Sequence, residues 1–395
     1  MNLKHNILKM YLLKGVLWFM VAMPIIVLFF QEHGLSLTEV MIIQAIYSLS
    51  VAIFEIPSGY IADLYGRKHT ILLSTIFSFS GYLMFSFFGG FYAFAAASTL
   101  VGIGGSLMSG SDSALLYDTL LETGDKKTYT KIEGRNYAIG NFSEATAGIL
   151  GGFLAVSSIY LPIYVQTGIL FLSIPIALTL VEPKMNDEDK IERSLKAILG
   201  VVKFAMVENA KLRWLIIYSS AMGVATLAMA WFAQPFFKEV EIPLAYFGIL
   251  WAGLNFSAGL TSFNSHKFDK DESNTKMLIY LALAMATSFV FLGFNMSLFG
   301  IIFIVFVYLL RGIVTPILRN AINENTSSNK RATVLSIRSF IIRISFAICA
   351  PIFGYLADNY SLNITFYTLA IIVGVFSVLS AIRLNRLDNK ASFAS

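Results

Sequence analysis

The sequence predicts an all-α membrane protein of twelve transmembrane helices arranged in two pseudo-symmetric six-helix bundles. Three observations predict this fold: the composition, a succession of apolar runs, and the distribution of Lys and Arg. Of the 395 residues, 56% are hydrophobic and only 13% are charged, whereas an average soluble domain carries roughly 25% charged residues. Such a chain is too apolar for water, so we expect it to lie in a lipid bilayer.

The apolar runs define the expected spans. A spanning helix needs about 20 mainly apolar residues, because no backbone polar group can stay unpaired in hydrocarbon. The first run lacks a small-residue cleavage site before Gln31, so we expect a retained span and not a signal peptide. The expected spans are residues 11–30, 39–62, 70–88, 91–117, 136–156, 159–181, 213–236, 244–265, 276–294, 297–318, 332–357 and 361–382.

The positions of Lys and Arg give the orientation. With twelve spans both termini lie on one side, and all but four of the 29 Lys and Arg residues lie on that same side. The exceptions are Lys238 in an opposite loop and three arginines within spans, Arg311, Arg338 and Arg343. Because the side rich in Lys and Arg is cytoplasmic, we expect a multi-pass protein of the cytoplasmic (inner) membrane with both termini in the cytoplasm.

A polar stretch divides the spans into two groups of six. The predicted domains are an N-terminal six-helix bundle over residues 1–181, a cytoplasmic linker over 182–212 and a C-terminal six-helix bundle over 213–395. A short similarity, GGFLA at 151–155 against FGYLA at 353–357, pairs the fifth span with the eleventh. Parallel six-span repeats of this kind are known in one class of membrane proteins.

The loop between spans two and three carries a distinctive pattern, Gly59-Tyr60-Ile61-Ala62-Asp63-Leu64-Tyr65-Gly66-Arg67-Lys68. Gly59 permits close helix approach, and Gly66 permits a tight turn with positive φ. The pattern resembles the loop signature of the major facilitator superfamily, G-x-L-A-D-x-x-G-R-K, with Ile61 in place of Leu. This resemblance extends over the whole chain, and it implies the fold of that superfamily and the activity of a secondary transporter.

The resemblance also implies a conformational latch, which in the family stabilises the outward-facing state. Asp63 is expected to face the N-terminus of the eleventh span near Ala332, and Arg67 to pair with Asp118 at the end of the fourth. Both contacts are physically favourable, because a carboxylate is stabilised at a helix N-terminus and Arg binds carboxylates bidentately. The predicted latch residues are Gly59, Asp63, Gly66, Arg67, Lys68 and Asp118.

Ionisable residues within the spans are candidate functional residues, since a charge at the bilayer centre costs roughly 2.5–3.5 kcal/mol on insertion scales. The acids lie in the first half and the bases in the second, all in or near the cytoplasmic half of the bilayer. We predict that they form a gate of acid against base and couple it to protons. The predicted proton-coupling and gate residues are Asp112, Glu144, Glu55, Arg311, Arg338 and Arg343.

Structural alternatives stand beside some of these roles. Glu144 shares one helical stripe with Gly140, Gly148 and Gly151, and such a stripe favours close helix packing. Glu55 lies two residues before a proline, where a helix distorts. Asp112 lies in a Gly/Ser-rich segment without a neighbouring base, which favours a functional role.

Large side chains on the first, seventh and tenth spans are candidate cavity residues, because the resemblance implies that these helices line the substrate cavity. An ordinary packing or interfacial role is the alternative for each of them. The predicted substrate-cavity residues are Trp18, Trp231, Gln234 and Tyr308.

The function predicted from these observations is proton-coupled efflux of a small organic molecule by alternating access, because the segment 54–68 resembles bacterial exporters of the superfamily. The alternatives are proton-coupled import of a nutrient or siderophore-like anion, which the three arginines favour, and a non-transporting membrane receptor. We expect a monomer in the lipid bilayer, powered by the proton gradient, without a metal, another cofactor or a nucleic-acid partner.

An enzyme and an ATP-driven pump are not expected. The four histidines, His5, His33, His69 and His266, are scattered and lack the spacing of a metal site. The single cysteine, Cys349, has no second thiol with which to form a disulfide or a Cys metal site. The sequence also contains no phosphate-binding G-x-x-x-x-G-K-[ST] loop.

Overall fold

The computed structural model describes residues 3–183, 195–265, 275–327 and 330–394, and these residues form helices and connecting segments without a strand. The chain divides into two compact units. The first comprises Met1–Leu35, Ile46–Glu192 and Pro243–Ala252, and the second comprises Ser36–Ala45, Arg193–Ile242 and Gly253–Ser395. Each unit therefore contains one short segment from the other half of the sequence.

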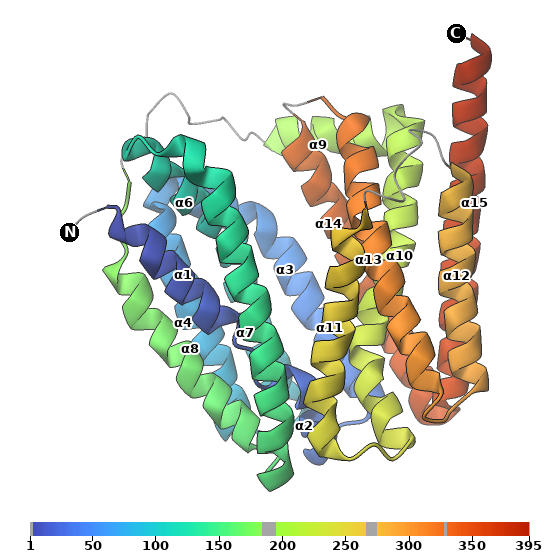
Figure 1. The fold of residues 1–395 in the computed structure, drawn as a ribbon, viewed down its shortest axis with the longest axis horizontal. Coiled ribbons are helices and arrows are strands. Elements are labelled where there is room, and N and C mark those ends of the chain that lie inside the picture. The colour runs from blue at the N-terminus through green and yellow to red at the C-terminus, as the bar shows by residue number, and fades with distance from the viewer. Residues whose placement is uncertain (1–2, 184–194, 266–274, 328–329, 395) are drawn as a thin grey trace. The chain divides into compact units, whose positions relative to one another are not determined.

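Figure 1 shows the helices of the described residues in their order along the chain. Those up to residue 183 are α1 (His5–Trp18), η1 (Met23–Ile25), α2 (Ile26–Glu32), α3 (Leu37–Tyr65), α4 (Arg67–Phe87), α5 (Phe91–Met108), α6 (Ser111–Glu122), η2 (Lys126–Thr128), α7 (Tyr129–Ser157) and α8 (Leu161–Thr179). Those after residue 194 are α9 (Leu195–Lys203), η4 (Phe204–Glu208), α10 (Ala210–Glu239), η5 (Leu244–Tyr246), α11 (Phe247–Phe263), α12 (Thr275–Phe294), α13 (Gly300–Glu324), α14 (Arg331–Asn359) and α15 (Leu362–Ala394).

Eleven helices of the described residues are long and apolar enough to cross a membrane, and a shorter apolar helix covers Met23–Glu32. The shorter helix belongs to the first apolar run of the sequence. The expected twelve spans are therefore approximately matched, with the first one divided.

The first span was expected to be one continuous helix over residues 11–30, but it is divided in the structure. α1 ends at Trp18, and regular structure resumes only at Met23. The backbone N–H of Ala22 is not left unpaired at this break, since it donates to the side-chain oxygen of the buried Gln166 at 3.5 Å. An unpaired backbone group is costly in an apolar environment, so Gln166 helps to make the break tolerable.

The fourth span is interrupted as well. α5 ends at Met108 and α6 begins at Ser111, and the intervening Gly110 has φ +81°. This left-handed conformation suits glycine because it has no Cβ. Discontinuous helices create free helix ends within a membrane, so this break provides a helix N-terminus inside the span.

An aromatic cluster forms part of the core of each unit. In the first unit Phe94 of α5 lies 5.0 Å from Phe30 of α2 and 5.6 Å from Phe85 of α4, measured between ring centroids. In the second unit Phe366 of α15 lies 6.2 Å from Phe236 of α10 and 6.3 Å from Phe289 of α12. These separations are typical of favourable aromatic pairs, so the clusters hold helices distant in the sequence together.

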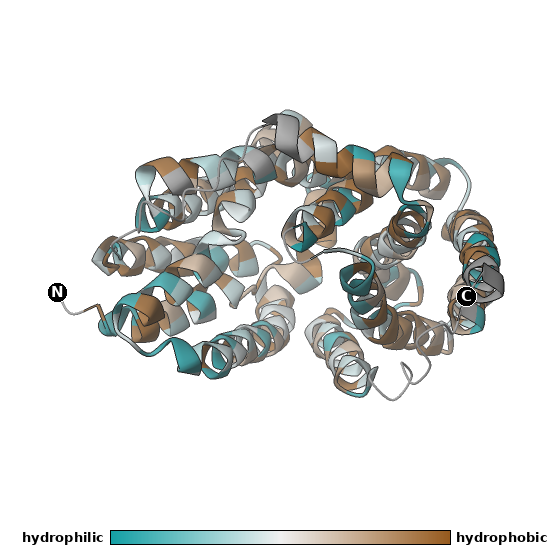
Figure 2. Cartoon of the chain, turned by 90° about the horizontal axis from the view of Figure 1, so that it is seen from above, coloured by the Kyte–Doolittle hydropathy of each residue, from teal (hydrophilic) through white to brown (hydrophobic). Residues whose placement is uncertain are grey.

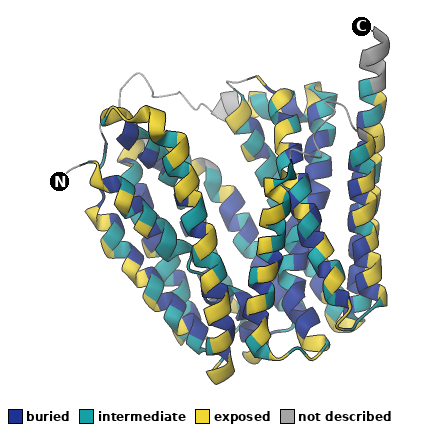
Figure 3. Ribbon diagram, in the orientation of Figure 1, coloured by how far each residue is buried: buried dark blue, intermediate teal, exposed yellow. Residues whose placement is uncertain are grey.

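Apolar side chains also cover outward-facing surfaces. Figure 2 shows hydrophobic residues on several sides of many helices, and Figure 3 shows exposed residues recurring along them. Large side chains such as Tyr92 and Phe263 are more than 80% exposed. A helix that is apolar on every side is suited to the interior of a large protein or to lipid, and the exposed aromatic residues here favour lipid.

Candidate functional site

A half-buried ion pair lies at the break in the fourth span. Asp112 is in the first turn of α6, two residues after Gly110, where the helix dipole favours a negative charge. Lys14 of α1 places its Nζ 3.4 Å from Asp112 Oδ2, and each side chain is only 16% exposed. The sequence segment around Asp112 contains no base, but the fold supplies one from α1. Lys14 is therefore paired inside the first unit and does not lie in a loop.

The environment of this ion pair is aromatic and tightly packed. The ammonium group of Lys14 lies 4.6 Å from the centre of the Trp18 ring, within the range of a cation–π interaction. Gly140 of α7 faces both residues, and a Cβ at this position would lie 3.3 Å from Lys14 Cε and from the Trp18 ring. The predicted cavity residue Trp18 thus lies beside the charged pair.

The predicted glycine stripe of α7 does make close contacts. Gly148 also packs closely, because a Cβ added to it would lie 3.1 Å from the ring of Trp251. A Cβ on Gly151 would collide with the backbone carbonyl of Val21 at the break of the first span. Glu144, on the same helix, is half-buried. The packing role expected for the stripe is confirmed, and the proton or gating role of Glu144 stays a prediction.

A second acid lies near Asp112. The backbone N–H of Ser113 donates to Asp112 Oδ1 at 2.8 Å, and the Ser113 hydroxyl donates to Glu133 Oε1 of α7 at 2.7 Å. Glu133 was not predicted from the sequence, because it lies in the polar first part of α7, where acids are common. Its contact with Ser113 brings a second carboxyl group to the start of α6.

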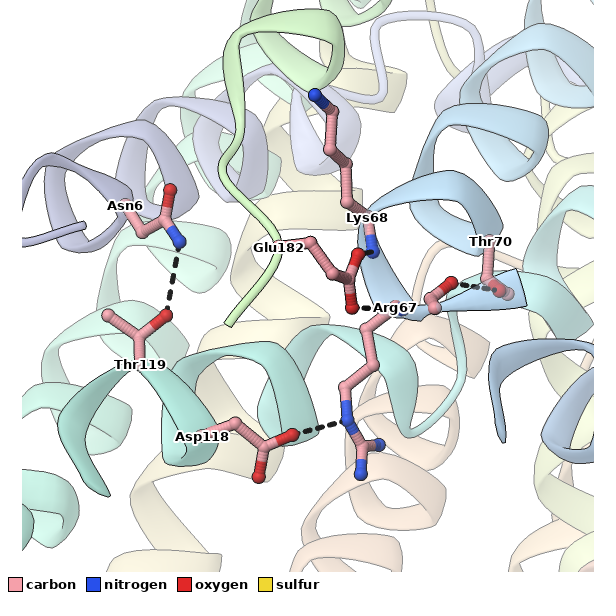
Figure 4. A network of polar contacts seen from close by, with 8 residues as sticks. Asn6, Arg67, Lys68, Thr70, Asp118, Thr119 and Glu182 are labelled. Atoms are coloured by element: carbon pink, nitrogen blue, oxygen red, sulfur yellow. Dashed lines mark hydrogen bonds and ion pairs between the residues drawn. The ribbon is translucent and has the colours of Figure 1, made fainter. Parts of the chain in front are cut away.

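The Gly66-Arg67-Lys68 turn binds two carboxylates (Figure 4). Arg67 Nε lies 2.5 Å from Asp118 Oδ2, with both side chains 22% exposed, as predicted. Glu182 accepts hydrogen bonds of 2.7 Å from the backbone N–H groups of Arg67 and Lys68 and so satisfies the N-terminus of α4. The sequence placed Glu182 in the linker and not in this site.

The conformation of Gly66 explains the glycine. Its φ of +89° confirms the predicted positive φ, and a Cβ would lie 2.8–2.9 Å from the carboxylate of Glu182. Gly59, also predicted, is half-buried in α3. The side chain of Asp63 lies outside the described residues, so its contact with the eleventh span stays a prediction.

Asn6 of α1 supports the same region through Thr119, which follows Asp118, and through Val181, which precedes Glu182. Its side chain is fully buried and donates to Thr119 Oγ1 of α6 at 3.1 Å. It also exchanges hydrogen bonds with both backbone groups of Val181, at 2.7 and 3.0 Å. Figure 4 shows Asn6 beside the segment that follows α8, and the side chain of Glu182, which belongs to this segment, pointing away from Asn6 toward Arg67 and Lys68. Asn6 therefore fixes the chain immediately before Glu182.

Two predicted arginines line one cavity in the second unit. The cavity has an empty volume of about 260 Å³, and its lining includes Arg311 of α13, Arg338 of α14, and Ser219 and Thr226 of α10. Arg338 Nε donates to the hydroxyl of Ser219. Arg311 lies 5.6 Å from the ring centre of Tyr308, a predicted cavity residue that is itself buried.

The remaining predicted residues lie apart from this cavity's lining. Arg343 is half-buried on α14, and Glu55 is half-buried in α3. On α10, Trp231 is half-buried and Gln234 is 1% exposed. Their proposed contacts with protons or substrate stay predictions.

Asp358 is a further polar residue that the sequence did not single out. It lies near the end of α14 and accepts hydrogen bonds from the backbone N–H groups of Leu37 and Thr38, at 2.9 and 2.7 Å, and from the Thr38 hydroxyl at 2.6 Å. These groups begin α3. One turn earlier, Gly354 allows the close approach, since a Cβ there would lie 2.7 Å from Thr38 Cα. The pentapeptide Gly354–Asp358, GYLAD, nearly repeats GYIAD at Gly59–Asp63, which was the available signal.

Within the described residues, apolar helices long enough to span a membrane, breaks in two of the spans and an ion pair beside one break are features of polytopic membrane transporters. The chain belongs to the Major Facilitator Superfamily, whose family model matches residues 10–310. It therefore acts in secondary transport of a small molecule. An uncharacterised MFS-type transporter of Bacillus subtilis (strain 168), YxaM, is 24% identical over 384 residues, which cover 93% of this chain and 92% of YxaM.

Solved structures show the same fold. The nucleoside transporter NupG matches with a TM-score of 0.76 at 15% identity, covering 97% of this chain and 98% of that one. An inward-facing, unoccupied bacterial homologue of the human lysosomal transporter Spinster matches with a TM-score of 0.75 at 14% identity, covering 98% of each chain. A peptide transporter POT in complex with sulfate matches with a TM-score of 0.74 at 14% identity, covering 97% and 95%.

Proposed function

We propose that this chain is a proton-coupled transporter that exports a small organic molecule by alternating access. Export rests on the likeness of residues 54–68 to bacterial exporters. The distribution of Lys and Arg supports a cytoplasmic membrane location with both termini in the cytoplasm. The proton gradient supplies the energy, and the protein works as a monomer without a cofactor.

The observation that carries proton coupling is the ion pair of Lys14 and Asp112, at 3.4 Å and 16% exposure, beside a helix break. A cation nearby favours the ionised form of a carboxyl group, whereas burial without a cation favours the protonated form. In the proposed cycle, Asp112 exchanges its partner Lys14 for a proton when α1 and α6 move apart, and the ion pair forms again when the proton leaves. In this way a conformational change is linked to a protonation equilibrium.

The test begins with a screen of small organic molecules in proteoliposomes under an imposed pH gradient. For the molecule so identified, Asp112→Asn is expected to reduce gradient-driven accumulation about 5- to 150-fold, the range typical of one coupling free energy. Asparagine keeps the shape of the side chain but cannot ionise, so downhill exchange should persist. Asp125→Asn is the matched control, because Asp125 pairs with Lys4 at 3.7 Å while 51% exposed, and it should transport like wild type.

The proposal has two further checks. Full gradient-driven transport by both Asp112→Asn and Glu144→Gln would contradict the proton role. Accumulation in everted vesicles, without accumulation in right-side-out vesicles, is expected for export, and the opposite result would identify an importer. Binding in liposomes without movement in either orientation would identify a receptor.

A further inference from the structure

The cavity of the second unit combines two cationic side chains with an apolar wall. Four helices contribute to it: α10, α12, α13 and α14. Arg311 and Arg338 share the lining with three hydroxyl-bearing residues, Ser219, Thr226 and Thr315. The apolar lining residues are Met222, Gly223, Met285, Val314 and Leu318.

The two arginines lack a carboxylate partner within the described residues. None of the ion pairs found there includes Arg311 or Arg338. Their contacts are with neutral groups, the hydroxyl of Ser219 and the ring of Tyr308. The described acids of the same unit lie near helix ends: Glu39, Glu208, Glu239, Glu241, Glu324, Asp358 and Asp388.

Such an arrangement favours binding of an anion. A cation within a membrane span is costly unless it is paired or solvated, so two cations in one cavity attract a mobile counter-charge. A guanidinium group offers a planar fork of donors that matches carboxylate and phosphate oxygens. The hydrogen bond to Ser219 orients one of these forks. The geometry therefore selects an oxyanion and not a cation or an uncharged polar group.

The remainder of the lining limits the kind of anion. Methionine side chains are flexible and polarisable and adapt to varied apolar shapes, and Met222 and Met285 lie on different helices. The empty space of about 260 Å³ includes part that is open to the outside, where Arg311 and Thr315 are exposed, so the site suits only a small anion. We propose that Arg311 and Arg338 bind the carboxylate or phosphate group of a small organic anion, with its apolar part against Met222 and Met285. This proposal depends on the proposed transport function in one respect: it takes the bound anion to be the transported molecule.

Binding to the purified full-length protein tests this directly. Thermal unfolding is followed with a panel of small organic anions, benzoate and phenyl phosphate among them, each paired with a neutral partner such as benzamide or phenol at equal ionic strength. Members of the anion series should raise the melting temperature and their neutral partners should not. Carboxylates and phosphate esters are separate arms, so their relative shifts identify the preferred headgroup.

The variants locate the site. Arg311→Gln and Arg338→Gln are each expected to weaken anion binding about tenfold or more, as for loss of a charge-assisted hydrogen bond. Arg383→Gln, an exposed arginine of α15, is the control and should bind like wild type. If a glutamine variant does not fold, lysine at the same position is the alternative. Lysine keeps the positive charge but lacks the planar set of guanidinium donors, so it should also weaken anion binding.

Three results would overturn the proposal: equal shifts for every anion and its neutral partner, undiminished binding by the Arg311 and Arg338 variants, or an equal loss in Arg383→Gln. Equilibrium binding requires no pH gradient. If transport proves independent of the pH gradient, the anion-binding results still stand. If the anions do not bind, gradient-driven transport of a different molecule can still be measured.

Discussion

Replacement of Gly66 by alanine is expected to destabilise the first unit more than replacement of any other glycine that has the same backbone conformation. Gly66 has φ +89° and ψ 156°, a region essentially restricted to glycine, where a side chain costs on the order of 1–3 kcal/mol. The added Cβ would also lie 2.8–2.9 Å from the Glu182 carboxylate. Glu182 would have to withdraw from the backbone N–H groups of Arg67 and Lys68, leaving the start of α4 uncapped.

The chain offers a closely matched control for this prediction. Gly90 precedes α5 with φ +88° and ψ 164°, nearly the conformation of Gly66, yet a Cβ there would meet nothing within 4 Å. Gly90→Ala should therefore lower the stability only through backbone strain, without a steric clash. Thermal unfolding of both purified variants measures the difference, at roughly 2–4 °C per kcal/mol for units of this size. Equal melting temperatures for the two variants would show that Glu182 does not constrain this turn.

The features predicted correctly depend on local sequence. The apolar runs specify spans because each must satisfy its own backbone hydrogen bonds in hydrocarbon. The positive φ of Gly66 follows from its place in a short pattern between two spans. The pairing of Arg67 with Asp118 was implied by the resemblance of that pattern to the loop signature of the superfamily. The close contacts of Gly140, Gly148 and Gly151 follow from a helical repeat within α7.

The partners that were missed lie far away along the chain. Lys14 is 98 positions from Asp112, and Glu182 is 115 positions from Arg67. From the sequence, Lys14 was counted with the Lys and Arg residues of the cytoplasmic side and Glu182 with the linker over 182–212. Only the packing of α1 against α6, and of the segment after α8 against α4, brings these charges together.

The break in the first span was hidden for a different reason. Residues 19–22 are apolar, like the rest of the run, and hydropathy does not distinguish a helix from an irregular apolar segment. The break depends on partners outside the run: Gln166, which accepts from the Ala22 N–H, and Gly151, which leaves room for the Val21 carbonyl. A single sequence does not reveal that these residues of α7 and α8 meet the first span.

Replacement of Asp358 by alanine is expected to loosen the start of α3 by removing three hydrogen bonds, those to the Leu37 and Thr38 N–H groups and to the Thr38 hydroxyl. Loss of an N-terminal cap costs about 0.5–2 kcal/mol. Ser36 and Glu39 form a local cap through hydrogen bonds of 2.9–3.2 Å, so α3 should remain folded. Hydrogen exchange at the first amides of α3 should therefore accelerate several-fold without loss of the fold.

Two further variants separate the cap from general disturbance at the end of α14. Asp358→Asn keeps one acceptor oxygen and should give an intermediate exchange rate. Asn359→Ala removes only a hydrogen bond to Tyr355 within α14 and should leave α3 unchanged. Unaltered exchange at Leu37 and Thr38 in Asp358→Ala would show that the carboxylate does not hold α3.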